Sequence, residues 1–225
     1  MRSKRFREAE KLIDSSKKYS IDEAVDLVKK TSNVKFDAAV ELHCRLGIEP
    51  TKADQVVRGT VTLPHGTGKK KKIAVFAEGK DAEAAKKAGA DVVGGAELIK
   101  EIKQKGGADF EVAVAHPSMM KHLGQIAKIL GPKGLMPNQK SETVASDVAK
   151  AVKELQGGKL TFRNDETGNI HQIIGKVSFD PKNLAANLTA FLEALKKAKP
   201  QGVKGTYLLT ATVCSSMGPS IRLAL

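Results

Sequence analysis

The stretch that decides the fold is KIAVFAEGKDAEAAKKAGADVV, residues 72–93. It begins with a short apolar run, 72–77, and continues with an Ala- and Lys-rich segment, 81–88, that is typical of a helix. A second short strand, expected over 90–93, follows this segment. A strand, a helix and a strand in this order predict a βαβ unit, in which the two strands lie parallel.

The same alternation continues to residue 155. We expect a helix over 96–104, a third strand over 110–115, a further helix opened by Pro117, and a last helix over Ser141–Leu155. Short and nearly continuous apolar strands are typical of a parallel sheet that helices cover on both faces. Residues 68–158 are therefore predicted to form a Rossmann-like three-layer α/β domain.

The N-terminal part of the chain has a different pattern. Ser20 and Glu23 form a capping box before a helix expected over 21–30. Residues 36–48 then alternate between apolar and polar side chains, which predicts a half-buried strand with one polar face. Another strand is expected over 55–63.

The C-terminal part returns to this alternating pattern. Residues 159–163 and 170–179 predict a β-hairpin, Asp180 precedes a predicted helix, and residues 206–214 predict a long strand. Neither end of the chain has enough elements to bury its apolar faces alone. The fold class we predict is α/β with two domains: a discontinuous α+β sandwich built from residues 1–67 and 159–225, and the Rossmann-like domain, 68–158, inserted into it.

The charge of the chain indicates a polyanionic partner. In 225 residues, Lys and Arg number 38 and Asp and Glu number 25, so the net charge is +13, and the excess is spread over both ends and the middle. A hydrophobic fraction of 41% excludes wholesale disorder. No apolar run reaches the roughly 20 residues of a membrane span, and no apolar segment typical of a secretory signal follows the basic N-terminus.

Cysteine and histidine usage predicts no metal site. Cys44 and Cys214 each lie in an apolar, strand-like run, which favours two buried thiols in a reducing compartment over a disulfide or a metal-binding pair. The five histidines are scattered and show no ligand spacing along the chain.

The sequence contains no recognisable catalytic motif. The segment 66–69 lacks the first glycine and the final Ser or Thr of a phosphate-binding P-loop, and only Gly79 follows the first Rossmann-like strand, where dinucleotide binding needs three glycines. We therefore expect no enzyme activity, no catalytic residue and no cofactor. The lysine run 69–72 is either a solvated segment or a phosphate contact.

Three segments offer chemistry that suits RNA. The loop 215–220 carries hydroxyl groups and a glycine, the segment 163–171 is either a hairpin turn or a recognition loop, and Phe36 is either a core residue or an aromatic that faces a base or sugar. Hydroxyl groups near a ribose are among the contacts that distinguish RNA from DNA.

Several motifs occur in an order that is typical of one protein family. They are GTVTLPHG (59–66), GAD (89–91) with VGG (93–95), ILGPKGLMP (129–137), FRND (162–165) and SMGPS (216–220). On these motifs the whole chain resembles the bacterial large-subunit ribosomal proteins of the L-one family, the proteins of the mobile ribosomal stalk.

The resemblance implies a structural protein of the large ribosomal subunit. Such a protein binds 23S rRNA at the stalk, assists the release of deacylated tRNA from the exit site, and represses translation of its own operon by binding the operon mRNA. The resemblance also implies a cytoplasmic location on the ribosome, a monomer off the ribosome, and RNA recognition by the discontinuous domain.

Carried onto this chain, the resemblance also implies a set of RNA-binding residues. Lys35, Arg163 and Lys176 would meet phosphates. Ser216 and the Gly218 backbone would meet ribose and bases. Ser216 stands where relatives often have Thr, so the hydroxyl is kept, and Met217 would pack against a sugar or base. The full expected set is Lys35, Phe36, Glu41, His43, Arg163, Thr167, His171, Lys176, Ser216, Met217 and Gly218.

Two other functions remain open at the level of sequence. One is a Rossmann-type RNA-modifying enzyme with a basic surface, which a glycine-rich cofactor loop would favour. The other is a general polyanion binder, whose affinity would come almost entirely from counterion release and would not distinguish one RNA from another.

Overall fold

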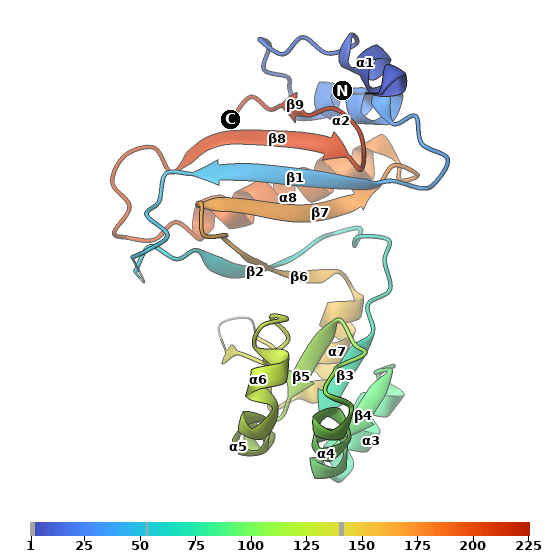
Figure 1. Ribbon diagram of the computed structural model, residues 1–225, viewed down its shortest axis with the longest axis vertical. Helices are drawn as coiled ribbons and strands as arrows, with labels where there is room; N and C mark the ends of the chain where they lie inside the picture. The colour runs from blue at the N-terminus through green and yellow to red at the C-terminus, as the bar shows by residue number, and fades with distance from the viewer. Residues whose placement is uncertain (1–2, 53, 140–141) are drawn as a thin grey trace. The chain divides into compact units, whose positions relative to one another are not determined.

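The structure is a computed structural model that describes residues 3–52, 54–139 and 142–225 (Figure 1). The chain divides into two compact units. One runs up to Gly68 and resumes at Leu160–Leu225, and the other is Lys69–Lys159. No helix within the described ranges combines the length and the apolar composition of a membrane span.

The main sheet of the first unit is antiparallel, with the strand order β7-β1-β8-β9. The strands are β1 (Ala39–Leu46), β7 (Asn169–Lys176), β8 (Leu208–Ser215) and β9 (Ile221–Arg222). The alternation predicted for β1 is confirmed, because Val40, Leu42, Cys44 and Leu46 are each 2% exposed or less. A bulge shifts the register with β7 between Val40 and Glu41.

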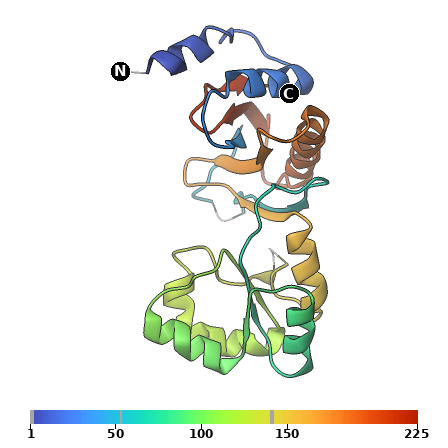
Figure 2. The same ribbon diagram turned by 90° about the vertical axis from the view of Figure 1, so that its right-hand side faces the viewer.

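Helices cover one face of this sheet. The helices α2 (Ile21–Thr31) and α8 (Pro181–Lys197) bury apolar side chains against the even-numbered side chains of β1. Both predicted caps are present, since Ser20 and Glu23 form a reciprocal capping box and Asp180 accepts a hydrogen bond from the Lys182 N–H. Figures 1 and 2 show α8 on one side of the sheet and no described helix over the opposite side of β1, β7 and β8.

The predicted hairpin between residues 159 and 179 is wrong. The strand β6 (Lys159–Arg163) pairs with β2 (Arg58–Thr62) in a separate two-stranded sheet, whereas β7 pairs with β1. Asn164 accounts for the separation, because its backbone N–H and side-chain oxygen bind the Val57 carbonyl and N–H at 3.1 and 2.8 Å. The chain then turns away from β6 before β7 begins.

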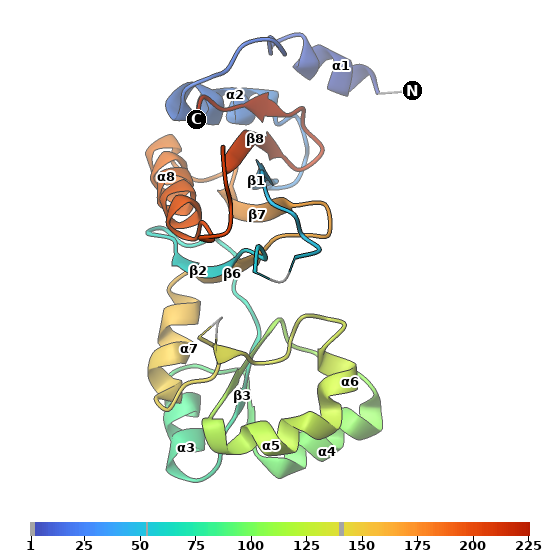
Figure 3. The same ribbon diagram turned by 90° about the vertical axis from the view of Figure 1, so that its left-hand side faces the viewer.

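The second unit contains a parallel sheet with the order β4-β3-β5. Its strands are β3 (Ile73–Phe76), β4 (Val92–Gly94) and β5 (Val112–Ala115). Figure 3 shows helices on both sides of β3, as the apolar strands predict. One side holds α3 (Lys80–Lys87) and α7 (Val148–Gln156). The other holds α4 (Ala96–Lys105), α5 (Met120–Leu123) and α6 (Ala127–Leu130), joined by the 3₁₀ turns η1 (Pro117–Met119) and η2 (Gly124–Ile126).

The last helix of this unit begins later than predicted. The sequence places its start at Ser141, which lies outside the described residues, but α7 begins at Val148 with Asp147 as its cap. Val144 instead forms a bridge with Ala115, and the backbone of Thr143 and Ala145 bonds to Ala115. Pairing with the end of β5 therefore replaces the first turns of the expected helix.

Candidate nucleic-acid interface

The open face of the main sheet carries a row of polar side chains on its central strand. Glu41 and His43 project from β1 on the face opposite the core, and their side chains are 33% and 30% exposed. His171 of β7 lies directly opposite His43, and Cys214 of β8 lies opposite Glu41. Residues that lie opposite each other in an antiparallel pair share a face, so these four side chains meet on one surface.

His43 is the centre of this group. Its Nδ1 lies 2.8 Å from His171 Nδ1, and its Nε2 lies 3.3 Å from Cys214 Sγ and 3.8 Å from Glu41 Oε2. Partial burial lowers the pKa of His43, the neighbouring His171 lowers it further, and the Glu41 carboxylate opposes both. Burial, together with Glu41, raises the pKa of the Cys214 thiol to about 11. Both pKa shifts favour the uncharged forms of His43 and Cys214.

The loop after β8 closes one end of this face. The Ser216 N–H donates to the Ala39 carbonyl at 2.9 Å, and Ser216 Oγ donates to Glu41 Oε1 at 3.0 Å. Met217 follows with a φ of 66° and a side chain that is 71% exposed. A Cβ at Gly218 would collide with Ser215 Oγ and crowd the Ser215 carbonyl, so the turn favours glycine there. The loop is thus a rigid turn that presents a thioether to solvent.

Other predicted residues lie at the same end of the sheet. Phe36 precedes β1 and is 57% exposed, which excludes a core role for it. Lys35 is exposed beside it. Lys176 ends β7 opposite Ala39, and its Nζ donates to the Asp37 carbonyl at 3.1 Å. Cations, an aromatic ring, a hydroxyl and a thioether therefore come together where β1 begins and β7 and β8 end.

The structure does not bring Arg163 and Thr167 to this end. Arg163 is exposed on β6, in the other sheet. Thr167 precedes β7, whose first residue lies opposite Arg45 at the far end of β1. Arg45 lies six positions along β1 from Ala39, which is about 20 Å of strand. The predicted set is therefore divided between the two ends of the main sheet and the separate sheet of β2 and β6.

The turn that contains Thr167 has its own hydrogen-bond network. Burial alone would raise the pKa of Asp165, but hydrogen bonds from the Asn169 N–H and from the hydroxyl and N–H of Thr167 hold it at about 2. His171 Nε2 lies 3.5 Å from the same carboxylate. The Thr167 hydroxyl is thus engaged within the turn.

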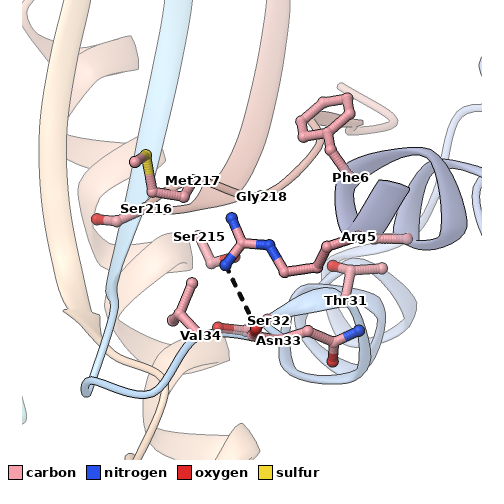
Figure 4. A pocket seen from close by; sticks show the side chains of 11 residues that line it. Arg5, Phe6, Thr31, Ser32, Asn33, Val34, Ser215, Ser216, Met217 and Gly218 are labelled. Atoms are coloured by element: carbon pink, nitrogen blue, oxygen red, sulfur yellow. Dashed lines mark hydrogen bonds between the residues drawn. The ribbon is translucent and has the colours of Figure 1, made fainter. Parts of the chain in front are cut away.

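Arg5 is a cation near the loop that the sequence did not single out. It projects from α1 (Lys4–Glu10), and its guanidinium donates to the Asn33 carbonyl at 3.3 Å. Figure 4 shows it beside Ser215 and Gly218, in a small pocket between α1, the segment after α2 and the β8 loop. Ser216 and Met217 point away from it. The basic N-terminal sequence is the one feature that could have indicated Arg5. The position of Arg5 beside the loop depends on tertiary packing, which the sequence does not reveal.

Comparison with known proteins identifies the family of this chain. The model of the ribosomal protein L1p/L10e family matches residues 28–219. The chain belongs to this family. It is also similar to the large ribosomal subunit protein uL1 of Kosmotoga olearia, with 52% identity over 222 residues, which cover 99% of this chain and 96% of that protein.

Membership in the L1p/L10e family reduces the number of functions that the open face could serve. Proteins of this ribosomal family are structural and non-enzymatic, so the RNA-modifying enzyme considered from the sequence is excluded. The matched residues include both the start of β1 and the loop Ser216–Gly218, which form the candidate interface.

Proposed function

We propose that this chain is a structural protein of the large ribosomal subunit that binds 23S rRNA through the open sheet face and the loop Ser216–Gly218. The first unit is, in this proposal, a discontinuous RNA-binding domain, and Lys69–Lys159 is an inserted domain. The observation that carries the proposal is the end of the sheet, where two exposed apolar side chains, Phe36 and Met217, lie among cations and a hydroxyl group.

This combination suits folded RNA better than it suits a protein surface. Unstacked bases stack on exposed aromatic rings, and lysines contact phosphates without reading sequence. Ser216 and Glu41 offer a hydroxyl and a carboxylate that hydrogen-bond to ribose 2′-OH groups and to base amines. The net charge of +13 supplies long-range attraction to the RNA backbone.

The proposal includes the finer roles that the family resemblance implies. The protein, in the cytoplasm and on the ribosome, assists release of deacylated tRNA from the exit site. It also represses its own operon by binding a similar structure in the operon mRNA. Off the ribosome it is a monomer. Two RNA targets for one interface require that they share a local structure, because the interface is a single rigid surface.

Crosslinking in cells, followed by sequencing of the bound fragments, tests these roles together. The proposal predicts strong enrichment of one segment of 23S rRNA, weaker enrichment of the leader of the protein's own operon mRNA, and tRNA fragments. Enrichment of small-subunit rRNA instead, or an even distribution over all RNA, contradicts it.

The salt dependence of binding separates this proposal from general polyanion binding. Affinity for 23S rRNA and for bulk RNA should be measured at two salt concentrations. Nonspecific binding is almost entirely counterion release, so a general binder loses its affinity for both RNAs in parallel. The proposal predicts a preference for 23S rRNA that persists at the higher salt concentration.

A further inference from the structure

The fold brings together metal-ligating side chains that lie far apart in the sequence. Glu41 and His43 come from β1, and Cys214 comes from β8, 171 residues away from His43. One ligand atom from each lies within 4.8 Å of the others. These three residue types, an oxygen, a nitrogen and a sulfur ligand, are those that zinc sites use.

Two of the three separations in this group are close to those of a zinc coordination shell, and the third, between Cys214 Sγ and the Glu41 carboxylate, is within 4.8 Å. Nε2 of His43 lies 3.3 Å from Cys214 Sγ and 3.8 Å from Glu41 Oε2. In a tetrahedral site with ordinary zinc bond lengths, neighbouring ligand atoms are about 3.4–3.6 Å apart. Glu41 Oε2, in a side chain that is 33% exposed, is the ligand atom that must move closer to His43 for a metal to bind.

The surrounding hydrogen bonds orient two of these ligands. His43 Nδ1 lies within hydrogen-bonding distance of His171 Nδ1, at 2.8 Å. The other ring nitrogen of His43, Nε2, therefore faces Cys214 and Glu41. His171 in turn has its Nε2 3.5 Å from the Asp165 carboxylate. Ser216 Oγ donates to Oε1 of Glu41, so Oε2 is the oxygen that faces His43. Partners of this kind, which fix the ring and carboxylate orientation, accompany metal ligands.

We propose that Glu41, His43 and Cys214 form a zinc-binding site on the open face of the sheet, with a fourth position left for water. The thiol of Cys214 gives up its proton to solvent as the metal binds, because the thiolate is the ligand. The thiolate and the imidazole select zinc over Mg²⁺ and Ca²⁺, which prefer oxygen ligands. His171 acts as a positioning residue through His43.

Absorption spectroscopy with Co²⁺ tests the site in the full-length, reduced protein without RNA. Cobalt in a tetrahedral site with a thiolate gives a thiolate-to-metal charge-transfer band in the near ultraviolet. We expect this band to saturate at one Co²⁺ per chain and to disappear when one equivalent of Zn²⁺ is added. Failure to observe a band in the wild-type protein overturns the proposal.

The two cysteines provide a matched pair of variants. Cys214→Ser should abolish the charge-transfer band, whereas Cys44→Ala should leave it unchanged, because Cys44 is 1% exposed on the opposite face of the same sheet. A band that survives Cys214→Ser, or that is lost in Cys44→Ala while the protein stays folded by circular dichroism, overturns the assignment.

A second pair of variants keeps the test decisive if Cys214→Ser does not fold. His43→Gln should weaken Co²⁺ binding at least about tenfold. His171→Ala should weaken it about tenfold and leave the charge-transfer band in place, because the thiolate remains a ligand. Wild-type cobalt affinity in His43→Gln overturns the site. The titration contains no RNA, so its outcome is independent of whether the face binds 23S rRNA.

Discussion

Ser216 Oγ donates a hydrogen bond of 3.0 Å to Glu41 Oε1 and so joins the loop after β8 to the open face of β1. The backbone makes the same connection, since the Ser216 N–H donates to the Ala39 carbonyl at 2.9 Å. Two segments separated by most of the chain are held in one geometry by these bonds. A surface with this rigidity can recognise a folded RNA without a large ordering cost.

Ser216→Ala should weaken binding to 23S rRNA by about 1–3 kcal/mol, because it removes a hydroxyl and releases Glu41 from its orientation. The melting temperature should change little, since Glu41 is partly exposed and water replaces the lost partner. A filter-binding titration measures the effect. Thr189→Ala on α8 is the control, because it removes an exposed hydroxyl on the helical side of the unit. Equal affinities for the two variants would remove Ser216 from the interface.

Phe36→Ala should reduce affinity for 23S rRNA by about 1–3 kcal/mol, the usual contribution of one base stacked on an aromatic ring. Stability should be nearly unchanged, because Phe36 is 57% exposed and buries little area. Leu209→Ala is the matched control, since Leu209 is 47% exposed toward the far end of β1. A loss of the same size in both variants would show that the effect is not local to the start of β1.

Met217→Gly should change the stability of the protein and its affinity for RNA in opposite directions. Met217 has a φ of 66°, which costs a non-glycine residue about 1 kcal/mol, so glycine should raise the free energy of unfolding by roughly that amount. Affinity for 23S rRNA should fall, because the exposed thioether is lost. Denaturant unfolding and RNA titration of the same variant measure both effects. Reduced stability, or unchanged affinity, contradicts this interpretation.

Asp165→Asn should change how stability depends on pH. The pKa of Asp165 in the folded chain is about 2, below its ordinary value of 3.8, so its ionised form stabilises the fold above pH 4. This contribution is lost as the pH falls from 4 toward 2. The free energy of unfolding of the wild type should therefore exceed that of Asp165→Asn at pH 5, and the difference should shrink toward pH 2. The effect is modest, because the carboxylate is 39% exposed. A difference that is constant with pH contradicts the assignment.

Local patterns predicted the elements that depend on neighbours along the chain. The alternation of β1 appears as buried Val40, Leu42, Cys44 and Leu46, and the capping box of Ser20 and Glu23 forms as expected. These signals are reliable because side-chain periodicity and helix caps involve residues that are close in the sequence.

Features that depend on distant partners were missed. The turn at Asn164 predicted a hairpin, but β6 and β7 belong to different sheets because Asn164 binds Val57. The segment around Val144 has helical spacing, yet it pairs with Ala115. The sequence spacing of His43 and Cys214 does not indicate that they lie close together, because the pairing of β1 with β8 brings them together. The family resemblance places Thr167 in the same RNA-binding set as Ser216, although the two residues lie at opposite ends of β1.

The central claim, that the two chain ends form the RNA-binding surface, is tested most directly by dividing the protein. Residues 1–68 joined to 160–225 by a short glycine linker should keep affinity for 23S rRNA within about tenfold of the full chain, whereas residues 69–159 should bind at least about a hundredfold more weakly. Each part contains its own hydrophobic core, and circular dichroism checks that each is folded. Strong binding by residues 69–159, together with a folded but inactive protein made of the two joined ends, would contradict the account.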